Sequence, residues 1–172
     1  MNITLIGMPA VGKSFIGKKL AKIMNYDFID GDDLIVASEN KPLQKIIDLQ
    51  GEDKFLEIEK KVILSLKEKK LQNTVISPGG SVVYISDVMK FLKGISKIIY
   101  LEGDFKEIEK RMHNRDSRGI VGLKNKTLKQ LYDERTILYR NYADIIIKVP
   151  AKINREKSAN EIIENLNLQL AG

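Results

Sequence analysis

The chain has 172 residues, of which 43% are apolar and 30% are charged, and its formal net charge at pH 7 is +6. This length suits one domain, and the composition excludes a disordered, collagen-like or disulfide-rich chain. With no cysteine and a single histidine, His113, the chain offers neither thiolate ligands nor a multi-histidine metal site. No apolar run approaches the ~20 residues that span a bilayer, and the first residues lack a basic signal-peptide region. We therefore expect a cytoplasmic protein with one domain over residues 1–172.

The positive charge is spread along the whole chain, with acidic residues between the lysines, as on solvent-exposed helix faces. Aromatic residues make up only 6% of the chain, and none alternates with arginine in a base-stacking pattern. The sequence therefore favours solvated surface charge over a nucleic-acid-binding surface.

Short apolar runs alternate with longer amphipathic stretches, which predicts strands separated by helices. In chain order we predict strand 3–6, helix 13–24, strand 26–29, helices 32–37, 43–49 and 51–69, strand 74–77, helix 87–92, strand 97–101, helix 105–112, loop 113–126, helix 127–142, strand 145–147 and helix 159–168. Apolar strands that alternate with helices are typical of a parallel sheet covered on both faces. The predicted fold is a three-layer α/β/α domain with about five parallel strands.

The most specific motif is the segment 7–14, Gly-Met-Pro-Ala-Val-Gly-Lys-Ser, which fits the phosphate-loop pattern G-x-x-x-x-G-K-[ST]. It follows the first predicted strand and opens the first helix, whose positive end faces the phosphates. In this motif Lys13 brings a positive charge to the terminal phosphates and the Ser14 hydroxyl ligates Mg²⁺. We therefore expect a nucleoside triphosphate as ligand and phosphoryl transfer or hydrolysis as chemistry. The predicted nucleotide-binding residues here are Gly7, Pro9, Ala10, Val11, Gly12, Lys13, Ser14 and Phe15.

Two carboxylates follow the second predicted strand, at the carboxyl edge where ligands bind in parallel sheets. Asp30 and Asp32 could share one side of the turn, so that one helps Ser14 to hold Mg²⁺ and the other accepts the proton of an attacking hydroxyl. Aspartate is also a preferred N-cap, which is the competing interpretation. Beside the phosphate loop the pattern favours a functional role for Asp32, and a cap or first-turn charge for Asp33.

These motifs together resemble the shikimate kinase family. The phosphate loop, Asp30-Gly31-Asp32, the Gly79-Gly80 turn after the third strand and the late helix with Leu138-Tyr139-Arg140 are similar to the family pattern, with compatible spacing over about residues 1–166. The resemblance implies the nucleoside-monophosphate-kinase fold, with a lid at about residues 113–126. It also implies a monomer that transfers the γ-phosphoryl group of ATP to the 3-hydroxyl of shikimate.

The resemblance assigns roles to residues outside the phosphate loop. It implies that Asp32 binds the substrate hydroxyls and acts as base, that Gly79 and Gly80 line the substrate pocket, and that Arg140 holds the substrate carboxylate. It also implies that Arg118, in the lid, reaches the transferred phosphate, so that Lys13, Asp32 and Arg118 form the catalytic set. Arg111 and Arg155 are expected at the adenine.

The sequence departs from the family pattern at three places. Leu56 stands where the family has a second arginine for the carboxylate, which removes a charged hydrogen bond worth ~1.5–3 kcal/mol. Ser81 replaces the last glycine of the turn, and Gly119-Ile120-Val121 follows Arg118 where the family has Pro-Leu. Two alternatives therefore stay open: a kinase of the same fold with another hydroxyl acceptor, and a phosphate-loop protein that is not a metabolic kinase.

Overall fold

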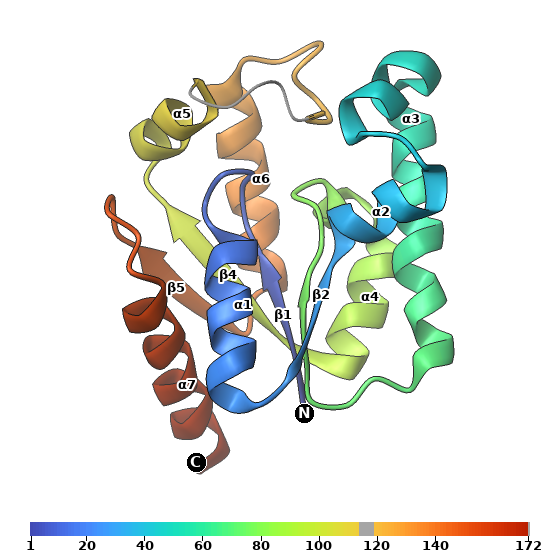
Figure 1. Cartoon of the computed structure of the whole chain (residues 1–172). Coiled ribbons are helices and arrows are strands. Elements are labelled where there is room, and N and C mark those ends of the chain that lie inside the picture. Colours follow the sequence, from blue (N-terminus) through green and yellow to red (C-terminus); the bar gives the residue numbers. More distant parts are fainter. Residues whose placement is uncertain (114–118, 172) are drawn as a thin grey trace.

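The five apolar runs of the sequence form one parallel sheet in the computed structural model, which describes residues 1–113 and 119–171. The strands lie in the order β2-β3-β1-β4-β5 and every neighbouring pair is parallel (Figure 1). Their bounds are Asn2–Ile6 for β1, Asp27–Asp30 for β2, Thr74–Ser77 for β3, Ser96–Gly103 for β4 and Ile145–Val149 for β5.

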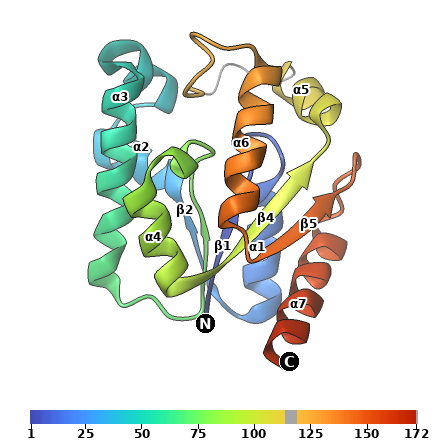
Figure 2. The ribbon, with the colours of Figure 1, turned by 180° about the vertical axis from the view of Figure 1, so that it is seen from behind.

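Helices cover both faces of the sheet. α1 (Lys13–Met24) and α7 (Arg155–Ala171) lie side by side on one face (Figure 1). α4 (Ser86–Ile95) and α6 (Leu128–Tyr142) lie on the opposite face (Figure 2). The remaining helices are α2 (Gly31–Glu39), α3 (Leu43–Leu64), α5 (Phe105–His113) and the 3₁₀ helices η1 (Ser65–Lys69) and η2 (Val82–Tyr84). The three-layer α/β/α arrangement confirms the predicted fold class.

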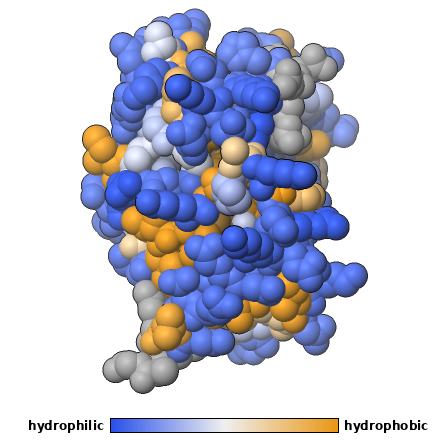
Figure 3. All heavy atoms as spheres, turned by 90° about the vertical axis from the view of Figure 1, so that its left-hand side faces the viewer, coloured by the Kyte–Doolittle hydropathy of each residue, from blue (hydrophilic) through white to orange (hydrophobic). Residues whose placement is uncertain are grey.

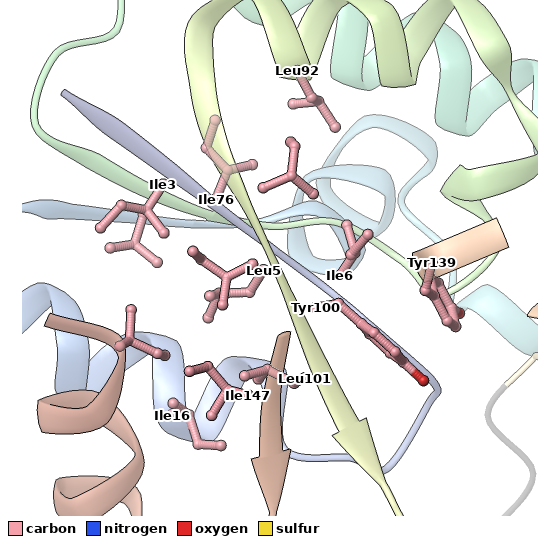
Figure 4. Close-up of a cluster of buried hydrophobic side chains, with 14 of the residues drawn as sticks. Ile3, Leu5, Ile6, Ile16, Ile76, Leu92, Tyr100, Leu101, Tyr139 and Ile147 are labelled. Atoms are coloured by element: carbon pink, nitrogen blue, oxygen red, sulfur yellow. The ribbon is translucent and has the colours of Figure 1, made fainter. Parts of the chain in front are cut away.

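Burial explains the sequence character of each strand. The central strand β1 and its neighbour β3 are buried along their whole length, and neither contains a charged residue. Side chains from both faces of the sheet pack into the main core, where Leu5 and Leu101 meet Ile16 of α1 and Ile147 of β5 (Figure 4). The edge strand β5 alternates buried and exposed residues, since only one of its faces is covered.

The structure agrees with the prediction of two helical segments in the region of α3. The sequence predicts helices 43–49 and 51–69, and α3 (Leu43–Leu64) is interrupted between two helical segments at Gly51. Gly51 has φ 84° and ψ 168°, a conformation that interrupts the helix and that glycine adopts without steric cost. The last predicted turns are the separate helix η1.

The topology brings three loops to one edge of the sheet. Because all strands are parallel, the segments that follow β1, β2 and β3 leave from the same side. The register pairs Asp30 with Ser77, so the aspartates after β2 start beside the Pro78-Gly79-Gly80 turn after β3. The phosphate loop follows β1, which is the next strand along.

The face of the molecule that carries α5, β5 and α7 is mostly hydrophilic (Figure 3). Apolar patches are visible among the charged residues of this face (Figure 3). Exposed apolar side chains in β5 and α7 include Ile146 and Leu168. Within the described residues, no helix combines the length and the apolar character needed to cross a membrane.

Candidate active site

A cavity of about 340 Å³ lies at the carboxyl edge of the sheet. Its walls come from the phosphate loop and start of α1, from the residues after β2 and β3, from α3, from the segment that precedes α6, and from α6 itself. The lining residues are Pro9, Ala10, Gly12, Lys13, Ser14, Phe15, Lys18, Asp30, Asp32, Leu43, Phe55, Ser77, Pro78, Gly79, Gly80, Ser81, Gly119, Ile120, Val121 and Arg135.

The phosphate loop forms one end of this cavity. Gly12, with φ +106°, occupies the left-handed region at the start of α1, and a Cβ there would lie 2.8 Å from Ile153 Cδ1. Only glycine therefore fits this position without displacing the neighbouring loop. Of the predicted nucleotide-binding residues in the loop, Gly7 and Val11 are buried behind the wall, whereas the others line the cavity.

Lys13 is held inside the loop. Its Nζ donates hydrogen bonds to the carbonyl oxygens of Gly7 at 3.0 Å and Met8 at 3.2 Å. Removal from water lowers the pKa of Lys13 to about 8, although the nearby carboxylates of Asp32 and Asp30 oppose this shift. The ammonium is thus placed where the negative charge of a phosphate would replace the lost hydration.

Asp30, the last residue of β2, and Asp32, two residues later, have different surroundings. Asp30 is the N-cap of α2, since its Oδ1 accepts a hydrogen bond from the backbone N–H of Asp32 at 3.0 Å. Its Oδ2 also accepts a hydrogen bond from Ser14 Oγ at 2.6 Å, which joins it to the phosphate loop. Asp32 lines the cavity from the first turn of α2, and Asp33 lies in the same turn with its side chain exposed.

Two predicted adenine residues lie beside the phosphate loop without lining the cavity. Arg111 donates to the carbonyl oxygens of Ala151 at 2.5 Å and Ala10 at 3.4 Å, so it joins the loop after β5 to the phosphate loop. Arg155 places its guanidinium 5.0 Å from the ring centre of Phe15, which is 47% exposed. These contacts place two guanidinium groups and the exposed ring of Phe15 next to the phosphate loop.

The other end of the cavity contains a buried arginine that the sequence analysis did not select. Arg135 is 1% exposed and lines the cavity from α6. Its Nη2 donates to the carbonyl oxygen of Val121 at 2.8 Å, and its Nη1 lies 3.1 Å from the point where a Cβ on Gly80 would stand. Gly80 thus allows the backbone of the turn and this guanidinium to approach each other.

Arg140 does not line this cavity. Its Nη2 forms an ion pair with Glu102 Oε1 at 2.5 Å, and its side chain is 54% exposed. Helix phase explains this placement: Leu131, Arg135 and Tyr139 repeat every four residues along the buried face of α6, and residue 140 lies about 100° away from Tyr139. An arginine within an apolar helical stripe is the sequence signal that identifies Arg135.

The remaining predictions concern the lid and the departures from the family pattern. Arg118 lies outside the described residues. Gly119, Ile120 and Val121 line the cavity, and the N–H of Gly122 donates to Glu52 Oε1 at 2.8 Å. Leu56 is half-buried among the apolar residues of α2, α3 and Val121, and Phe55 rather than Leu56 lines the cavity.

A buried carboxyl group lies behind the cavity wall. Glu59 of α3 is 0% exposed, and its Oε2 accepts a hydrogen bond from Ser81 Oγ at 2.7 Å. Burial raises the pKa of Glu59 to about 7, and the Asp32 charge adds to this effect, whereas the Ser81 hydrogen bond, Arg135 and Lys13 oppose it. Sequence periodicity predicted the helix here but gave no reason to expect an acid on its buried face.

Glu59 gives the stability of the fold a pH dependence. Its pKa of about 7 in the folded protein lies above the ordinary value of 4.5, so between these pH values the folded state binds more protons than the unfolded state. The contribution is therefore fully present below about pH 4.5 and is lost as the pH rises towards 7. Because Glu59→Gln removes this term, we expect the free energy of unfolding of the wild type to fall by about 2 kcal/mol relative to the variant between pH 5 and 8.

Urea unfolding of both proteins at several pH values measures this difference. Glu57→Gln is the matched control, since Glu57 is an exposed residue of the same helix whose pKa is lowered by Lys54, and its removal should leave the pH dependence between pH 5 and 8 unchanged. Parallel pH profiles for the wild type and Glu59→Gln would contradict the prediction.

Comparison with known proteins agrees with this architecture. The family model for shikimate kinase matches residues 9–167. A shikimate kinase from Clostridium botulinum (strain Loch Maree / Type A3) is 38% identical over 166 residues, which cover 95% of this chain and 94% of that protein. One from Francisella tularensis subsp. novicida (strain U112) is 36% identical over 86% of this chain and 84% of its own.

Solved structures share the same fold. Shikimate kinase from Aquifex aeolicus superposes with a TM-score of 0.81 and 30% identity, covering 97% of this chain and 96% of that chain. Shikimate kinase from Acinetobacter baumannii, in complex with shikimate, has a TM-score of 0.86 and 24% identity, covering 98% and 93%. The match over nearly the whole chain, with the phosphate loop at the carboxyl edge of the same fold, places this protein in the shikimate kinase family.

Proposed function

We propose that this protein transfers the γ-phosphoryl group of ATP to a hydroxyl group of shikimate. The observation that carries the proposal is that one cavity joins a phosphate loop with Lys13 to the carboxylate of Asp32 and the guanidinium of Arg135. In this cavity Lys13 suits the phosphates of the donor, Asp32 suits the acceptor hydroxyl, and Arg135 suits the acceptor carboxylate. Membership of the shikimate kinase family supports this assignment. On the strength of the family resemblance, we further propose that the protein acts as a monomer.

The phosphate end suits ATP together with Mg²⁺. Ser14 and Asp30, which are joined by a hydrogen bond of 2.6 Å, supply hard oxygen donors beside the phosphate loop, and this is the donor type that Mg²⁺ prefers. Among the described residues there is no cluster of three or more acidic or imidazole ligands, which suits an ion that is held partly by the phosphates of its nucleotide. When bound, Mg²⁺ offsets the negative charge that develops on the phosphates. Lys13 and the N-terminus of α1 add positive charge from the protein.

The acceptor end suits a hydroxylated carboxylic acid. Asp32 accepts a hydrogen bond from the acceptor hydroxyl and orients its oxygen towards the γ-phosphorus. As the new O–P bond forms and the bond to the β-phosphate oxygen breaks, the hydroxyl proton passes to Asp32 or to solvent, and ADP leaves. Arg135 binds the acceptor carboxylate, and Gly119, Ile120 and Val121 shield the reaction from water. Arg118 remains the predicted cation for the γ-phosphoryl group, on the strength of the resemblance.

A second candidate function has one specific observation in its favour. Beside Arg135, the acceptor end of the cavity is walled by Leu43, Phe55 and Val121, so its second side is apolar. A hydroxylated acceptor with an apolar face in place of a doubly bound carboxylate would fit this wall. The second candidate is therefore a kinase of the same mechanism that acts on another such hydroxyl compound.

The test of the proposed function is ADP release from Mg-ATP by the purified protein, with and without shikimate over a wide concentration range. We expect strong stimulation that saturates with shikimate, and formation of one phosphorylated product per ADP. Lys13→Met should abolish the stimulation and so exclude a contaminating kinase. ATP binding without stimulation by shikimate, together with stimulation by another polyhydroxylated compound, would favour the second candidate.

Asp32→Asn should separate catalysis from nucleotide binding. The amide keeps the size of the side chain but cannot accept the hydroxyl proton, so we expect kcat to fall by about 10²–10⁴-fold. ATP affinity, measured by calorimetry, should change by less than about twofold, because Lys13 and the loop hold the phosphates. Asp33→Asn, one residue along the same turn, should behave as the wild type. Loss of ATP binding in Asp32→Asn would instead assign Asp32 to the metal or the fold.

Arg135 and Arg140 can be tested as a matched pair. Lysine keeps the charge of Arg135 but removes the planar pair of donors, a loss of ~1.5–3 kcal/mol that corresponds to about 10- to 100-fold in affinity. We therefore expect Arg135→Lys to raise KM for shikimate by this factor, with KM for ATP unchanged. Arg140→Lys, which alters the exposed pair with Glu102, should leave both constants within about twofold. The reverse result would restore Arg140 as the residue that holds the carboxylate.

A further inference from the structure

Ser81 joins the cavity wall to a buried acid behind it. It is 6% exposed and lines the cavity at the end of the turn that follows β3. Its Oγ donates to Glu59 Oε2 at 2.7 Å across 22 residues of chain, so the hydroxyl connects this turn to the middle of α3. The hydroxyl is thus committed to Glu59 while the rest of the residue faces the cavity.

Glu59 depends on this hydrogen bond for its position. Its Oε1 has no hydrogen-bond partner, and no cation forms an ion pair with it among the described residues. Leu56 lies one turn earlier on α3, at a spacing from which a cationic side chain could reach Glu59, but leucine offers no donor. A buried carboxyl group with so few partners is costly and takes up any donor within reach. Lys13 and Arg135 are close enough to act on its charge.

The position of Glu59 fixes the shape of the turn. A Cβ on Gly79 would lie 2.3 Å from Glu59 Oε1 and 3.3 Å from Asp32 Oδ1. Glu59 therefore packs directly behind Gly79, at a point that Asp32 approaches from the cavity. A rotation of the Glu59 side chain would either free Gly79 to move or press on it.

We propose that Ser81 is a positioning residue for the phosphoryl acceptor: by holding Glu59 against Gly79, it fixes the Gly79-Gly80 turn and keeps Glu59 away from Lys13 and Arg135. This role rests on the proposed function, since Asp32, Gly80 and Arg135 bind the acceptor there. Without the hydroxyl, Glu59 turns towards a cation, and the turn loses its support. The acceptor end of the cavity is then disordered, whereas the phosphate loop keeps its own hydrogen bonds.

Ser81→Ala tests this role in the full-length protein. The loss of a hydrogen bond to a buried carboxyl group should raise KM for shikimate by about tenfold or more. KM for ATP should stay within about twofold, because Lys13 remains bonded to the loop. Ser81→Thr, which keeps the hydroxyl, should restore most of the acceptor affinity. Ser38→Ala is the matched control, since the Ser38 hydroxyl bonds only to the carbonyl of Ile35 on an exposed helix face.

A double-mutant cycle shows whether Ser81 acts through Glu59. Glutamine at position 59 keeps the side-chain size and carries no charge, so the Ser81→Ala change should alter KM for shikimate by less than about twofold in the Glu59→Gln background. An equal effect of Ser81→Ala in both backgrounds, or no effect on KM in the wild type, would overturn the proposal. If Ser81→Ala lowers the unfolding temperature so far that kinetics fail, Ser81→Cys replaces it as a variant with a much weaker donor.

A second measurement separates this inference from the proposed function. Deuterium uptake by peptides that span residues 77–82 should be faster in Ser81→Ala than in the wild type and Ser81→Thr, whichever acceptor the enzyme uses. Unchanged uptake would overturn the positioning role. Faster uptake in a protein that shikimate fails to stimulate would leave the positioning role standing and overturn the choice of acceptor.

Discussion

The cavity at the carboxyl edge of the sheet brings two cations, Lys13 and Arg135, together with three acids, Asp30, Asp32 and Glu59. An unpaired charge in such a place costs several kcal/mol, so each of these groups depends on its neighbours. Lys13 donates hydrogen bonds to backbone carbonyls and lies near carboxylates, and Arg135 donates to a backbone carbonyl. Asp30 and Glu59 each accept a hydrogen bond from a serine hydroxyl. The parallel sheet makes this compensation possible, because it delivers the segments after β1, β2 and β3 to one place. Removal of any one of these charges therefore alters the electrostatic environment of the others. Variants that keep the size of the side chain, such as aspartate to asparagine, are for this reason the most informative.

Much of the fold could be predicted from residue patterns, because its strands are buried and short. The segments 74–77 and 145–147 contain apolar residues because each strand has at least one face covered by helices. Such short apolar segments can be recognised in the sequence without knowledge of their neighbours. The boundaries of α1 follow from Gly12 and Asn25, which both adopt left-handed conformations at its ends. The break at Gly51 was predictable, since a glycine lies between two amphipathic stretches, but the pattern did not show that residues 65–69 form the separate helix η1.

Site residues that lie in one short sequence segment were predictable. Site residues whose orientation depends on the rotation of a helix were less so. The sequence places Lys13, Ser14, Asp30 and Asp32 beside the strands that hold them, and the structure brings them into one cavity. The motif Leu138-Tyr139-Arg140 points to Arg140, but the rotation of α6 turns Arg135 towards the core and the cavity. Glu59 and Ser81 meet only through the tertiary packing of α3 on the turn after β3, and no local sequence pattern predicts such a contact.

The environment of Lys13 links the nucleotide to solution protons. Burial lowers the pKa of Lys13 to about 8, so at that pH the ammonium is only half-protonated. The negative charge of bound phosphates favours the protonated form, and each binding event near pH 8 therefore takes up a fraction of a proton. The observed heat of nucleotide binding must then vary with the ionisation enthalpy of the buffer, and the apparent affinity must weaken as the pH rises above 8. The burial that positions the Lys13 ammonium for phosphates therefore also makes the fraction of protein with bound nucleotide depend on pH.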